Sequence, residues 1–598
     1  MEILKIIDYY NLMDIKLSDV IKNQSIINIG CTGHVANGKS TIVKSLTGIT
    51  TQKFKSEKER NITINIGYAG CKIYYSKQTD EYRFTSSNTK DNILDSHGNV
   101  MVLVHHFSFV DCPGHESFMN NMITGTSVMD MAFLIEDCSS QIIPQPQTYE
   151  HLIALLNSNI KDILVLQNKC DLVDKEVIYI VKDKIDKFLN VLYKKHDLPI
   201  IPCIAQTGVN MNYIAKYLNH TIKSYSRDLN KPLLANIVRT FDINRSNIDY
   251  NKLKGGVIGG SILNGVIKIG DYIQISPGIV EKKNKKWVVN PIFTKITSLS
   301  CDSNQLKFAI PGGLIGFGTN LDPYLCKGNK LVGHVVSPPN ESPPIVYEVT
   351  IHYNRFKRDI KYKLNKNDCI KVGVMGSLVD GVIKDKSDDG LVLSLEKPTC
   401  LSSNKLTIIH SKNYKILGIG TVINHKLVDI INNIENIEDI ENKNKVKYNL
   451  INDLQYNNDY NYNFEKMVSH LEGCKVQKKK LNISKPVYNK IKRNQFSLIN
   501  FKEIINSCIN NNDTEDLEAI FIQEFEKEIK SKVSFNSQNH LLINEVVKKD
   551  IIDNSFIKLI IKMKRCRVCN STQTYLSKSD RLLKINCETC KSQNSYQR

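Results

Sequence analysis

The chain has 598 residues, of which 41% are hydrophobic and 24% are charged, together with 16 cysteines. This length exceeds what one hydrophobic core serves and predicts about four domains. The formal net charge is +19, and residues 443–598 hold 28 Lys and Arg against 17 Asp and Glu. A basic end suits a polyanion such as RNA. The alternative is that an Asn-, Ile- and Lys-rich composition raises lysine everywhere.

Targeting signals are missing from the sequence. We find no secretory leader and no apolar run near the length of a membrane span, so we expect a soluble, cytoplasmic protein without a membrane partner. Twelve cysteines stand singly, several on apolar strands, as expected of reduced core thiols.

A glycine-rich stretch at residues 33–40 follows an apolar strand and precedes a helical pattern. A strand, such a turn and a helix together predict a P-loop, whose backbone N–H groups and helix dipole bind phosphate. Lys39 is expected to reach the phosphates and Ser40 to coordinate Mg²⁺. The expected nucleotide contacts of this stretch are Gly33, Val35, Ala36, Asn37, Gly38, Lys39, Ser40 and Thr41.

Two downstream stretches complete a phosphate and metal site. Asp111 ends an apolar strand, where its carboxylate can hold a water of the Mg²⁺ shell, and Gly114 can bring its N–H to the γ-phosphate. Thr63 lies in a polar segment between helix and strand. Its hydroxyl can reach the metal while γ-phosphate is present, as expected of a switch.

Residues 168–171 read Asn-Lys-Cys-Asp after another apolar strand. The Asp171 carboxylate can accept the two N–H groups that guanine presents side by side and adenine does not. The nucleotide is therefore predicted to be GTP or GDP. The expected base contacts are Asn168, Lys169, Asp171 and Ala205.

The pattern of predicted strands, helices and turns divides the chain into domains. Alternating strands and helices predict an α/β domain with a mostly parallel sheet, and short strands with glycine turns predict two β-barrels. A small α+β domain is expected after them. The predicted divisions are residues 1–25 (lead-in), 26–228 (α/β P-loop domain), 229–339 and 340–425 (barrels), 426–458 (partly helical linker), 459–561 (α+β domain, separate from the P-loop domain) and 562–598 (ribbon).

The last residues contain two CxxC pairs separated by seventeen residues. Four thiolates on two knuckles match tetrahedral Zn²⁺, and no further ligand leaves an open position, so a structural zinc ribbon is predicted. Redox use of one pair is the alternative, but it predicts a thioredoxin-like context that is absent. The predicted ligands are Cys566, Cys569, Cys587 and Cys590.

These motifs, taken together, resemble the gamma subunit of eukaryotic and archaeal initiation factor two, an elongation factor Tu-like GTPase. The resemblance rests on residues 27–36, 59–64, 111–115, 144–152 and 166–169, and it continues through the barrels at 254–257, 276–280 and 311–316. It covers about residues 15–425. Residues 460–462, 541–544 and 581–590 are similar to the core and zinc ribbon of the beta subunit. The chain therefore resembles gamma and beta joined in one polypeptide.

The resemblance implies a translation initiation GTPase, slow without an activator. It implies GTP-dependent binding of methionyl initiator tRNA between the GTPase domain and the first barrel, and delivery to the small ribosomal subunit. His115 would orient the attacking water, with Val35 and Ile62 as an apolar gate. Further partners implied are an alpha-type subunit, a GTPase activator and an exchange factor.

Four features depart from the family pattern. Asn37 stands where relatives usually have histidine, Ile204 replaces a small polar residue, and Cys71 lacks the usual cysteine knuckle around it. The long lysine blocks of the beta subunit are also absent. Two alternatives stay open: an elongation-type aminoacyl-tRNA carrier, and a non-hydrolysing protein that binds tRNA or ribosomes.

Overall fold

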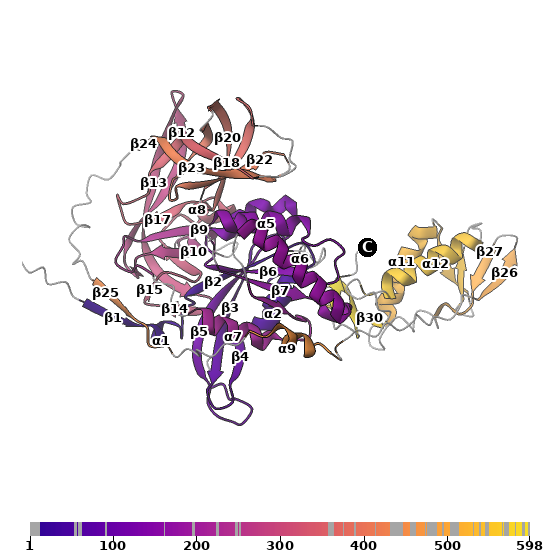
Figure 1. Cartoon of the computed structure of the whole chain (residues 1–598). Coiled ribbons are helices and arrows are strands. Elements are labelled where there is room, and N and C mark those ends of the chain that lie inside the picture. The colour runs from indigo at the N-terminus through magenta and orange to yellow at the C-terminus, as the bar shows by residue number, and fades with distance from the viewer. Residues whose placement is uncertain are drawn as a thin grey trace, which may run out of the picture.

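The structure is a computed structural model of the whole chain (Figure 1). It describes residues 12–52, 57, 63–89, 92–158, 160, 162–193, 198–222, 227–244, 249, 251, 253–356, 364–374, 376–387, 390–412, 414–430, 447–454, 462–472, 474, 487–492, 495–502, 514–529, 531–536, 540–543, 549–564, 566, 573–579, 582–588 and 592–595. No described helix is long and apolar enough to cross a membrane.

The α/β domain is built on a seven-stranded sheet of order β4-β3-β5-β2-β6-β7-β8. Strands β5, β2, β6, β7 and β8 are parallel, and the β3–β4 hairpin adds an antiparallel edge. The strands are β2 (Ile27–Thr32), β3 (Gly67–Ser76), β4 (Glu81–Ser86), β5 (Val102–Asp111), β6 (Met131–Asp137), β7 (Asp162–Asn168) and β8 (Ile200–Pro202). The central strands are buried along their length, as parallel strands covered on both faces must be.

Helices cover both faces of this sheet, as predicted. One core cluster joins the sheet to α4, α5 and α6, and a second joins it to α2 and α7. The helices are α2 (Lys39–Thr47), η1 (Glu116–Phe118), α4 (Met119–Thr126), α5 (Pro146–Asn157), η2 (Cys170–Leu172), α6 (Lys175–Tyr193) and α7 (Met211–Thr221). This layering leaves the carboxyl ends of β2, β5, β6 and β7 on one edge of the sheet.

The first barrel closes in the order β12-β17-β9-β10-β16-β13, with β12 also pairing with β13. Its glycines permit tight contacts: a Cβ on Gly260 would lie 1.8 Å from the Asn236 carbonyl oxygen. Its elements are β9 (Leu234–Phe241), β10 (Val257–Asn264), β11 (Ile267–Lys268), β12 (Tyr272–Lys283), β13 (Lys286–Cys301), β14 (Asn304–Leu306), β15 (Phe308–Ala309), β16 (Ile315–Thr319), α8 (Pro323–Cys326), η4 (Lys327–Asn329) and β17 (Val335–Ser337).

The second barrel is closed in the order β18-β21-β20-β19-β22-β23. Its strands are β18 (Ile345–Arg355), β19 (Cys369–Val374), β20 (Ser377–Lys386), β21 (Leu391–Cys400), β22 (Lys405–His410) and β23 (Ile416–Leu427). An apolar cluster of Val289, Val335, Ile345 and Cys400 joins the two barrels. Both predicted barrels are confirmed.

The segments predicted as lead-in and partly helical linker form strands where the structure describes them. The N-terminal β1 (Leu12–Lys16), followed by α1 (Leu17–Val20), pairs in parallel with β25 (Lys447–Ile451). The short β24 (Asp429–Ile430) pairs with β13. The spaced isoleucines predicted a partly helical linker. Three of them, Ile434, Ile437 and Ile440, lie in residues 431–446, outside the described part, while the described ends of the linker form β24 and β25.

The helix expected near Phe464–Leu471 forms as α9 (Phe464–Ser469). It was predicted to belong to the separate C-terminal α+β domain, but it packs on the P-loop α/β domain. Met467 and Val468 are buried in the two cores of that domain. Asn210 donates from Nδ2 to the carbonyl oxygens of both Met467 and Pro202, at 2.8 Å each. A helix of six residues is not stable alone, so this contact is what holds it.

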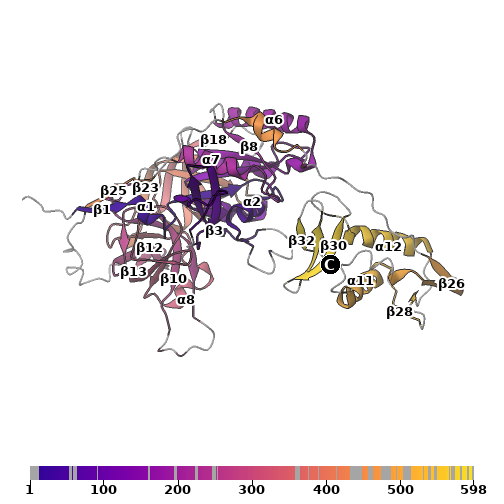
Figure 2. The same ribbon diagram turned by 90° about the horizontal axis from the view of Figure 1, so that it is seen from below.

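The C-terminal α+β domain stands apart from the barrels in both views (Figures 1 and 2). Its sheet has the order β26-β27-β29-β28, and phenylalanines from α11 and α12 fill its core. The elements are β26 (Tyr488–Lys492), β27 (Gln495–Leu498), α11 (Thr514–Ile529), β28 (Val533–Phe535), β29 (Leu541–Ile543) and α12 (Lys549–Lys564). A three-stranded antiparallel sheet follows: β30 (Thr574–Ser579), β31 (Leu582–Cys587) and β32 (Gln593–Ser595).

Candidate nucleotide site at the carboxyl edge of the sheet

The loop between β2 and α2 takes the shape of a phosphate-binding loop because of its glycines. Gly33 and Gly38 have φ of 136° and 95°, which side chains rarely adopt. A Cβ would lie 2.3 Å from the Ile135 carbonyl oxygen at Gly33 and 2.4 Å from Nδ2 of Asn168 at Gly38. Gly38 is also the N-cap of α2, so the helix points its positive dipole end at the loop.

Lys39, the first residue of α2, turns back into this loop. Its Nζ donates to the carbonyl oxygens of Gly33 at 2.9 Å and His34 at 2.6 Å. Burial lowers the pKa of Lys39 to about 8, and the nearby Asp111 opposes this shift. An amine held at the centre of a ring of backbone groups is placed to meet phosphate oxygens.

Four oxygen-bearing side chains meet beside the loop. Asp111 accepts from Ser40 Oγ and from Thr51 Oγ1, both at 2.6 Å, and Thr63 Oγ1 lies 3.0 Å from Ser40 Oγ. The other Asp111 oxygen is buried and makes no hydrogen bond to the described residues. Burial raises the pKa of this carboxyl.

This oxygen cluster fits Mg²⁺, which prefers carboxylate, hydroxyl and water ligands. Ser40, Thr63 and Asp111, predicted as the metal residues, come together from three separate segments. Thr51 belongs to the same cluster and was not predicted. It precedes a charged stretch and carries no motif of its own, so only the fold reveals it.

Asn168 connects the parts of the base site. Its Nδ2 donates to the Asn37 carbonyl oxygen at 2.9 Å, and its Oδ1 accepts from the Ala205 N–H at 3.0 Å. Lys169 takes a left-handed conformation with φ of 62° and pairs with Asp137 at 2.6 Å. The partly exposed Asp171 carboxyl follows, and burial raises its pKa. The four predicted base residues are therefore brought together.

The side chain of Asn37 points away from the phosphate side of the loop. It is fully buried, and its Nδ2 donates to the Ile135 carbonyl oxygen at 2.8 Å and lies 3.4 Å from Glu136 Oε2. The asparagine that departs from the family pattern thus fixes the loop to β6. Of the predicted contacts, Val35 is half-buried, Ala36 is exposed with φ of 64°, and Thr41 is the third residue of α2.

Gly114 lies directly against the phosphate loop, since a Cβ there would stand 2.4 Å from Lys39 Nζ and 3.0 Å from the Val35 nitrogen. His115 is exposed and caps η1, where its Nδ1 accepts from the Ser117 N–H at 3.2 Å. Of the predicted apolar gate of Val35 and Ile62, only Val35 belongs to the described residues.

His151 is a buried residue of the site for which no role was predicted. Its Nδ1 accepts from the Gly33 N–H at 3.1 Å, and burial lowers its pKa to about 3, which keeps the ring a neutral acceptor. Glu136 is likewise buried under the loop, and burial raises its pKa to about 8. His151 stood in a quoted string, residues 144–152, whereas nothing in the sequence singled out Glu136.

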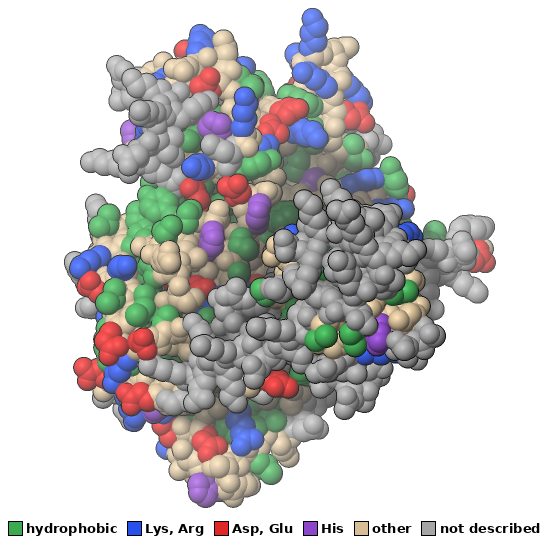
Figure 3. Space-filling model, turned by 90° about the vertical axis from the view of Figure 1, so that its right-hand side faces the viewer, with side chains coloured by type: hydrophobic (Ala, Val, Ile, Leu, Met, Phe, Trp, Pro, Cys, Tyr) green, Lys and Arg blue, Asp and Glu red, His purple; other side chains and the backbone are tan. Residues whose placement is uncertain are grey.

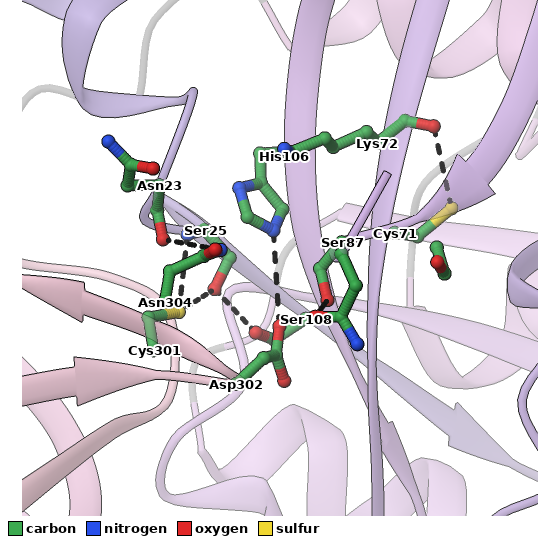
Figure 4. A network of polar contacts seen from close by, with 12 residues as sticks. Asn23, Ser25, Cys71, Lys72, Ser87, His106, Ser108, Cys301, Asp302 and Asn304 are labelled. Carbon is green, nitrogen blue, oxygen red and sulfur yellow. Dashed lines mark hydrogen bonds and ion pairs between the residues drawn. The ribbon is translucent and has the colours of Figure 1, made fainter. Parts of the chain in front are cut away.

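The first barrel also touches the α/β domain at the amino edge of the sheet, the edge opposite the nucleotide site. The turn between β13 and β14 presses on β3 and β5, where Asp302 lies 4.0 Å from His106 (Figure 4). Gly70 leaves room for it, since a Cβ there would stand 2.0 Å from Asp302 Oδ2. Beside this pair, Ser25 Oγ lies 2.5 Å from Ser108 Oγ and 3.3 Å from Cys301 Sγ.

The helix that follows Gly114 meets both barrels. On α4, Thr124 Oγ1 donates to the Gly376 carbonyl oxygen of the second barrel at 2.9 Å. Asn236 of the first barrel donates to the Ser127 carbonyl oxygen at 3.3 Å, at the end of the same helix. A shift of α4 would therefore change contacts with both barrels.

The predicted zinc ligands are described only in part. Cys566 and Cys587 are buried, and Ser592 approaches both: its Oγ lies 3.1 Å from Cys566 Sγ and its carbonyl oxygen accepts from the Cys587 N–H at 2.8 Å. Cys569 and Cys590 lie outside the described residues. Among the described residues, no group of three or more His, Cys, Asp or Glu side chains could hold a metal ion.

Comparison with known families agrees with this geometry. The elongation factor Tu GTP binding domain matches residues 24–241, and elongation factor Tu domain 2 matches residues 255–337. The two family matches, together with the loop geometry and the two barrels, define a GTPase of the elongation factor Tu class.

Individual relatives narrow the family. The chain is 38% identical over 415 residues to the eukaryotic translation initiation factor 2 subunit gamma of Encephalitozoon cuniculi, a match that covers 68% of this chain and 94% of that protein. It is 37% identical over 435 residues to subunit 3 of the same factor from Drosophila melanogaster, with 69% and 91% covered. The chain belongs to the gamma-subunit family of translation initiation factor 2, and it is a GTPase.

Solved structures support the fold. A bacterial selenocysteine-specific elongation factor gives a TM-score of 0.52 at 20% identity, covering 90% of this chain and 83% of that one. The elongation factor SelB of Methanococcus maripaludis, in complex with a GTP analogue, gives 0.51 at 17% identity, with 88% and 96% covered.

Proposed function

We propose that this initiation GTPase binds methionyl initiator tRNA in its GTP form and delivers it to the small ribosomal subunit. The observation that carries the proposal is the position of α4. It begins five residues after Gly114, which lies against the phosphate loop, and it contacts both barrels through Thr124 and Ser127. Contacts of Thr63 and Gly114 with γ-phosphate and its metal would be transmitted to both barrels along this helix.

The nucleotide would be held by the residues described above. Lys39 neutralises phosphate charge, Ser40 and Thr63 offer hydroxyls to Mg²⁺, and the Asp111 carboxylate holds water of its shell. Bound Mg²⁺ would neutralise charge that develops on the phosphates. Asp171 accepts from guanine, while Asn168 fixes the loop and the Ala205 backbone around the base.

The test is a titration of the chain with charged initiator and charged elongator tRNA, each with GTP and with GDP. We expect at least tenfold tighter binding of initiator tRNA in the GTP form, which needs only about 1.4 kcal/mol of differential contact. Thr63→Ala should reduce this ratio, whereas Thr85→Ala on the distant β4 should preserve it. Equal affinity for both tRNAs, or equal affinity with GTP and GDP, would contradict the proposal and favour a non-hydrolysing protein that binds tRNA or ribosomes.

For hydrolysis, we propose that His115 orients the attacking water. It is exposed at the mouth of the site, one residue after Gly114. His115→Ala should leave GTP affinity nearly unchanged and slow hydrolysis about a hundredfold, because a water-positioning residue acts mainly in the transition state. Single-turnover hydrolysis with small ribosomal subunits measures this. Equal rates in variant and parent would remove His115 from the mechanism.

We also propose that residues 459–598 are a beta-subunit-like module carried on the same chain, with a structural Zn²⁺ at its end. The resemblance of its strings supports the first part, and the approach of Ser592 to both Cys566 and Cys587 supports the second. An alpha-type subunit, an activator and an exchange factor remain candidate partners. The small ribosomal subunit would be met by both halves of the chain.

Metal analysis of freshly purified, reduced protein tests the zinc. We expect one zinc per chain, lost in Cys566→Ser but retained in Cys474→Ser, a partly exposed cysteine outside the CxxC pairs. GTP affinity should survive in both variants because the two sites lie in separate domains. Absence of zinc from the parent protein would contradict the proposal.

A further inference from the structure

The β12–β13 hairpin projects from the first barrel and carries an unusual tip, residues 281–287, which we name the basic finger. Four of the five residues 282–286 are lysine, against 80 Lys and Arg in the whole chain of 598. This density exceeds what an overall lysine-rich composition explains. In Figure 1 the hairpin ends at the top of the molecule, and in Figure 3 Lys and Arg side chains gather on the projection at the top.

The finger is braced at its base. Trp287, the single tryptophan of the chain, packs against the apolar cluster that joins the two barrels. The β24 strand adds a third strand beside Val288 and Val289. At the tip, Lys282 Nζ lies 5.0 Å from the centre of the Trp287 ring. A second such pair, Lys295 over Tyr272, lies further along the same two strands at 5.5 Å.

The charge of the finger is solvent-exposed and weakly compensated. All four lysines are exposed, and Glu281 is the one acid in residues 279–289. Glu281 pairs with Lys283 at 3.2 Å, with both side chains more than half exposed, so water screens that pair. Among the described residues, no carboxylate lies within ion-pair distance of Lys282, Lys285 or Lys286.

The turn places a lysine where glycine would be less strained. Asn284 and Lys285 both have positive φ, 49° and 66°, as a two-residue hairpin turn requires. Asparagine tolerates this conformation well, but lysine does not. A charged side chain at this position therefore opposes the local backbone preference, which points to a use for the charge.

The register divides the charges between the two faces of the ribbon. Lys283 pairs with Lys286, and Lys282 pairs with Trp287 one step further from the turn. Successive side chains of a strand point to opposite faces, so lysines lie on both. Such a tip suits an anion that surrounds it, as the phosphate-lined grooves of folded RNA do, better than a flat acidic surface.

We propose that the basic finger binds the phosphate backbone of structured RNA, at a surface separate from the nucleotide site and independent of the bound nucleotide. The contact goes beyond initiator tRNA capture, which depends on GTP. Its strength should follow salt, because each neutralised phosphate releases counterions. The aromatic rings would add a surface for sugar or base contacts.

The experiment measures binding of the full chain to a fluorescent A-form RNA duplex over a range of salt, with GTP and with GDP. In the finger variant, Lys282, Lys283, Lys285 and Lys286 are changed to glutamine. The control variant changes four exposed lysines elsewhere, Lys184, Lys254, Lys397 and Lys412, to glutamine. Both variants lose the same net charge, so a difference between them reports position.

We expect the slope of log affinity against log salt to fall by about 3 in the finger variant and by less than about 1 in the control. Affinity at low salt should drop at least tenfold, equally with GTP and GDP. Lys285→Gly relieves the turn and removes one charge, so it should lower the slope by about 0.8 in a chain that folds normally.

Two outcomes would overturn the proposal: a finger variant that binds the duplex as the control variant does, or finger-dependent binding to vesicles of phosphatidylcholine and phosphatidylserine with none to RNA. Loss of the GTP preference for initiator tRNA would contradict the proposed function but not this contact, because duplex binding is expected to be the same in both nucleotides.

Discussion

The α/β domain uses two of its surfaces in different ways, and the difference shows what a sequence reveals. At the carboxyl edge of the sheet, the polar residues of the candidate nucleotide site come together, and each stands within a few residues of a strand end. On the surface where β8 and α6 pack, α9 docks through Phe464, Met467 and Val468. Each part of the first surface is a short turn at a strand end with a recognisable pattern of residue types, whereas the second surface depends on shape complementarity between segments more than 200 residues apart.

The largest effect is expected at the nucleotide edge. Lys39→Ala removes the amine that lies inside the loop and should weaken GTP binding roughly a thousandfold, about 4 kcal/mol. Lys44→Ala, on the exposed face of the same helix, is the matched control. Fluorescent nucleotide titration measures both. A loss below tenfold for Lys39→Ala would mean that the loop binds phosphate mainly through its backbone.

A charge placed in the α9 dock should separate the two surfaces. Met467→Asp buries a carboxylate in the apolar cluster around Met467, which costs about 3–5 kcal/mol and should release α9. The exposed neighbour in Lys466→Asp should leave it docked. Limited proteolysis near residue 460 reports release, and GTP affinity should stay within twofold. If affinity fell with release, the dock would be coupled to the base site through Asn210 and β8.

The sequence predicted which residues come together at the nucleotide edge because phosphate chemistry constrains residue type. Only glycine fits where Gly33 and Gly38 stand, and Lys39, Asp111 and Asn168 each have a role that few side chains can fill. The order of motifs along alternating strands and helices also made the parallel sheet and both barrels predictable. These parts of the fold follow from local pattern.

What could not be predicted depends on long-range contact. At the described ends of the linker, β24 pairs with β13 of the first barrel and β25 pairs with the N-terminal β1, and no local pattern identifies partners so far away in the sequence. The α9 helix was expected, but its packing on the α/β domain was not. An apolar helix face does not indicate by its sequence which surface it packs on. Glu136 and His151 contact the phosphate loop from buried positions. Buried supporting residues follow no fixed spacing in the sequence, so no motif identifies them.

A smaller loss of GTP affinity is expected when Asp171, the residue proposed to recognise guanine, is changed. Asp171→Asn should lower GTP affinity tenfold to hundredfold, about 1.5–3 kcal/mol for lost hydrogen bonds to a charged group. It should also shift preference toward xanthine nucleotides, because the amide can donate to the carbonyl that replaces the exocyclic amine of guanine. Competition between GTP and XTP measures the shift. Unchanged GTP affinity would show that Asp171 does not read the base.

The smallest effect is expected for Thr51, the residue of the oxygen cluster that belongs to no sequence motif. Thr51 donates to Asp111 Oδ2 at 2.6 Å, the same oxygen that accepts from Ser40. Thr51→Val keeps the volume and removes one donor, which should cost about 1 kcal/mol and weaken Mg²⁺-dependent GTP binding about fivefold.

Thr47→Val is the control, since Thr47 is also buried but donates to the Val43 carbonyl oxygen within its own helix. It should change stability without changing the Mg²⁺ dependence of GTP binding. A fivefold loss confined to Thr51→Val would place this residue in the site although nothing local marks it. Equal behaviour of the two variants would instead make Thr51 a packing residue. The oxygen cluster beside Asp111 would then consist only of Ser40, Thr63 and Asp111, the residues that the sequence predicted for the metal.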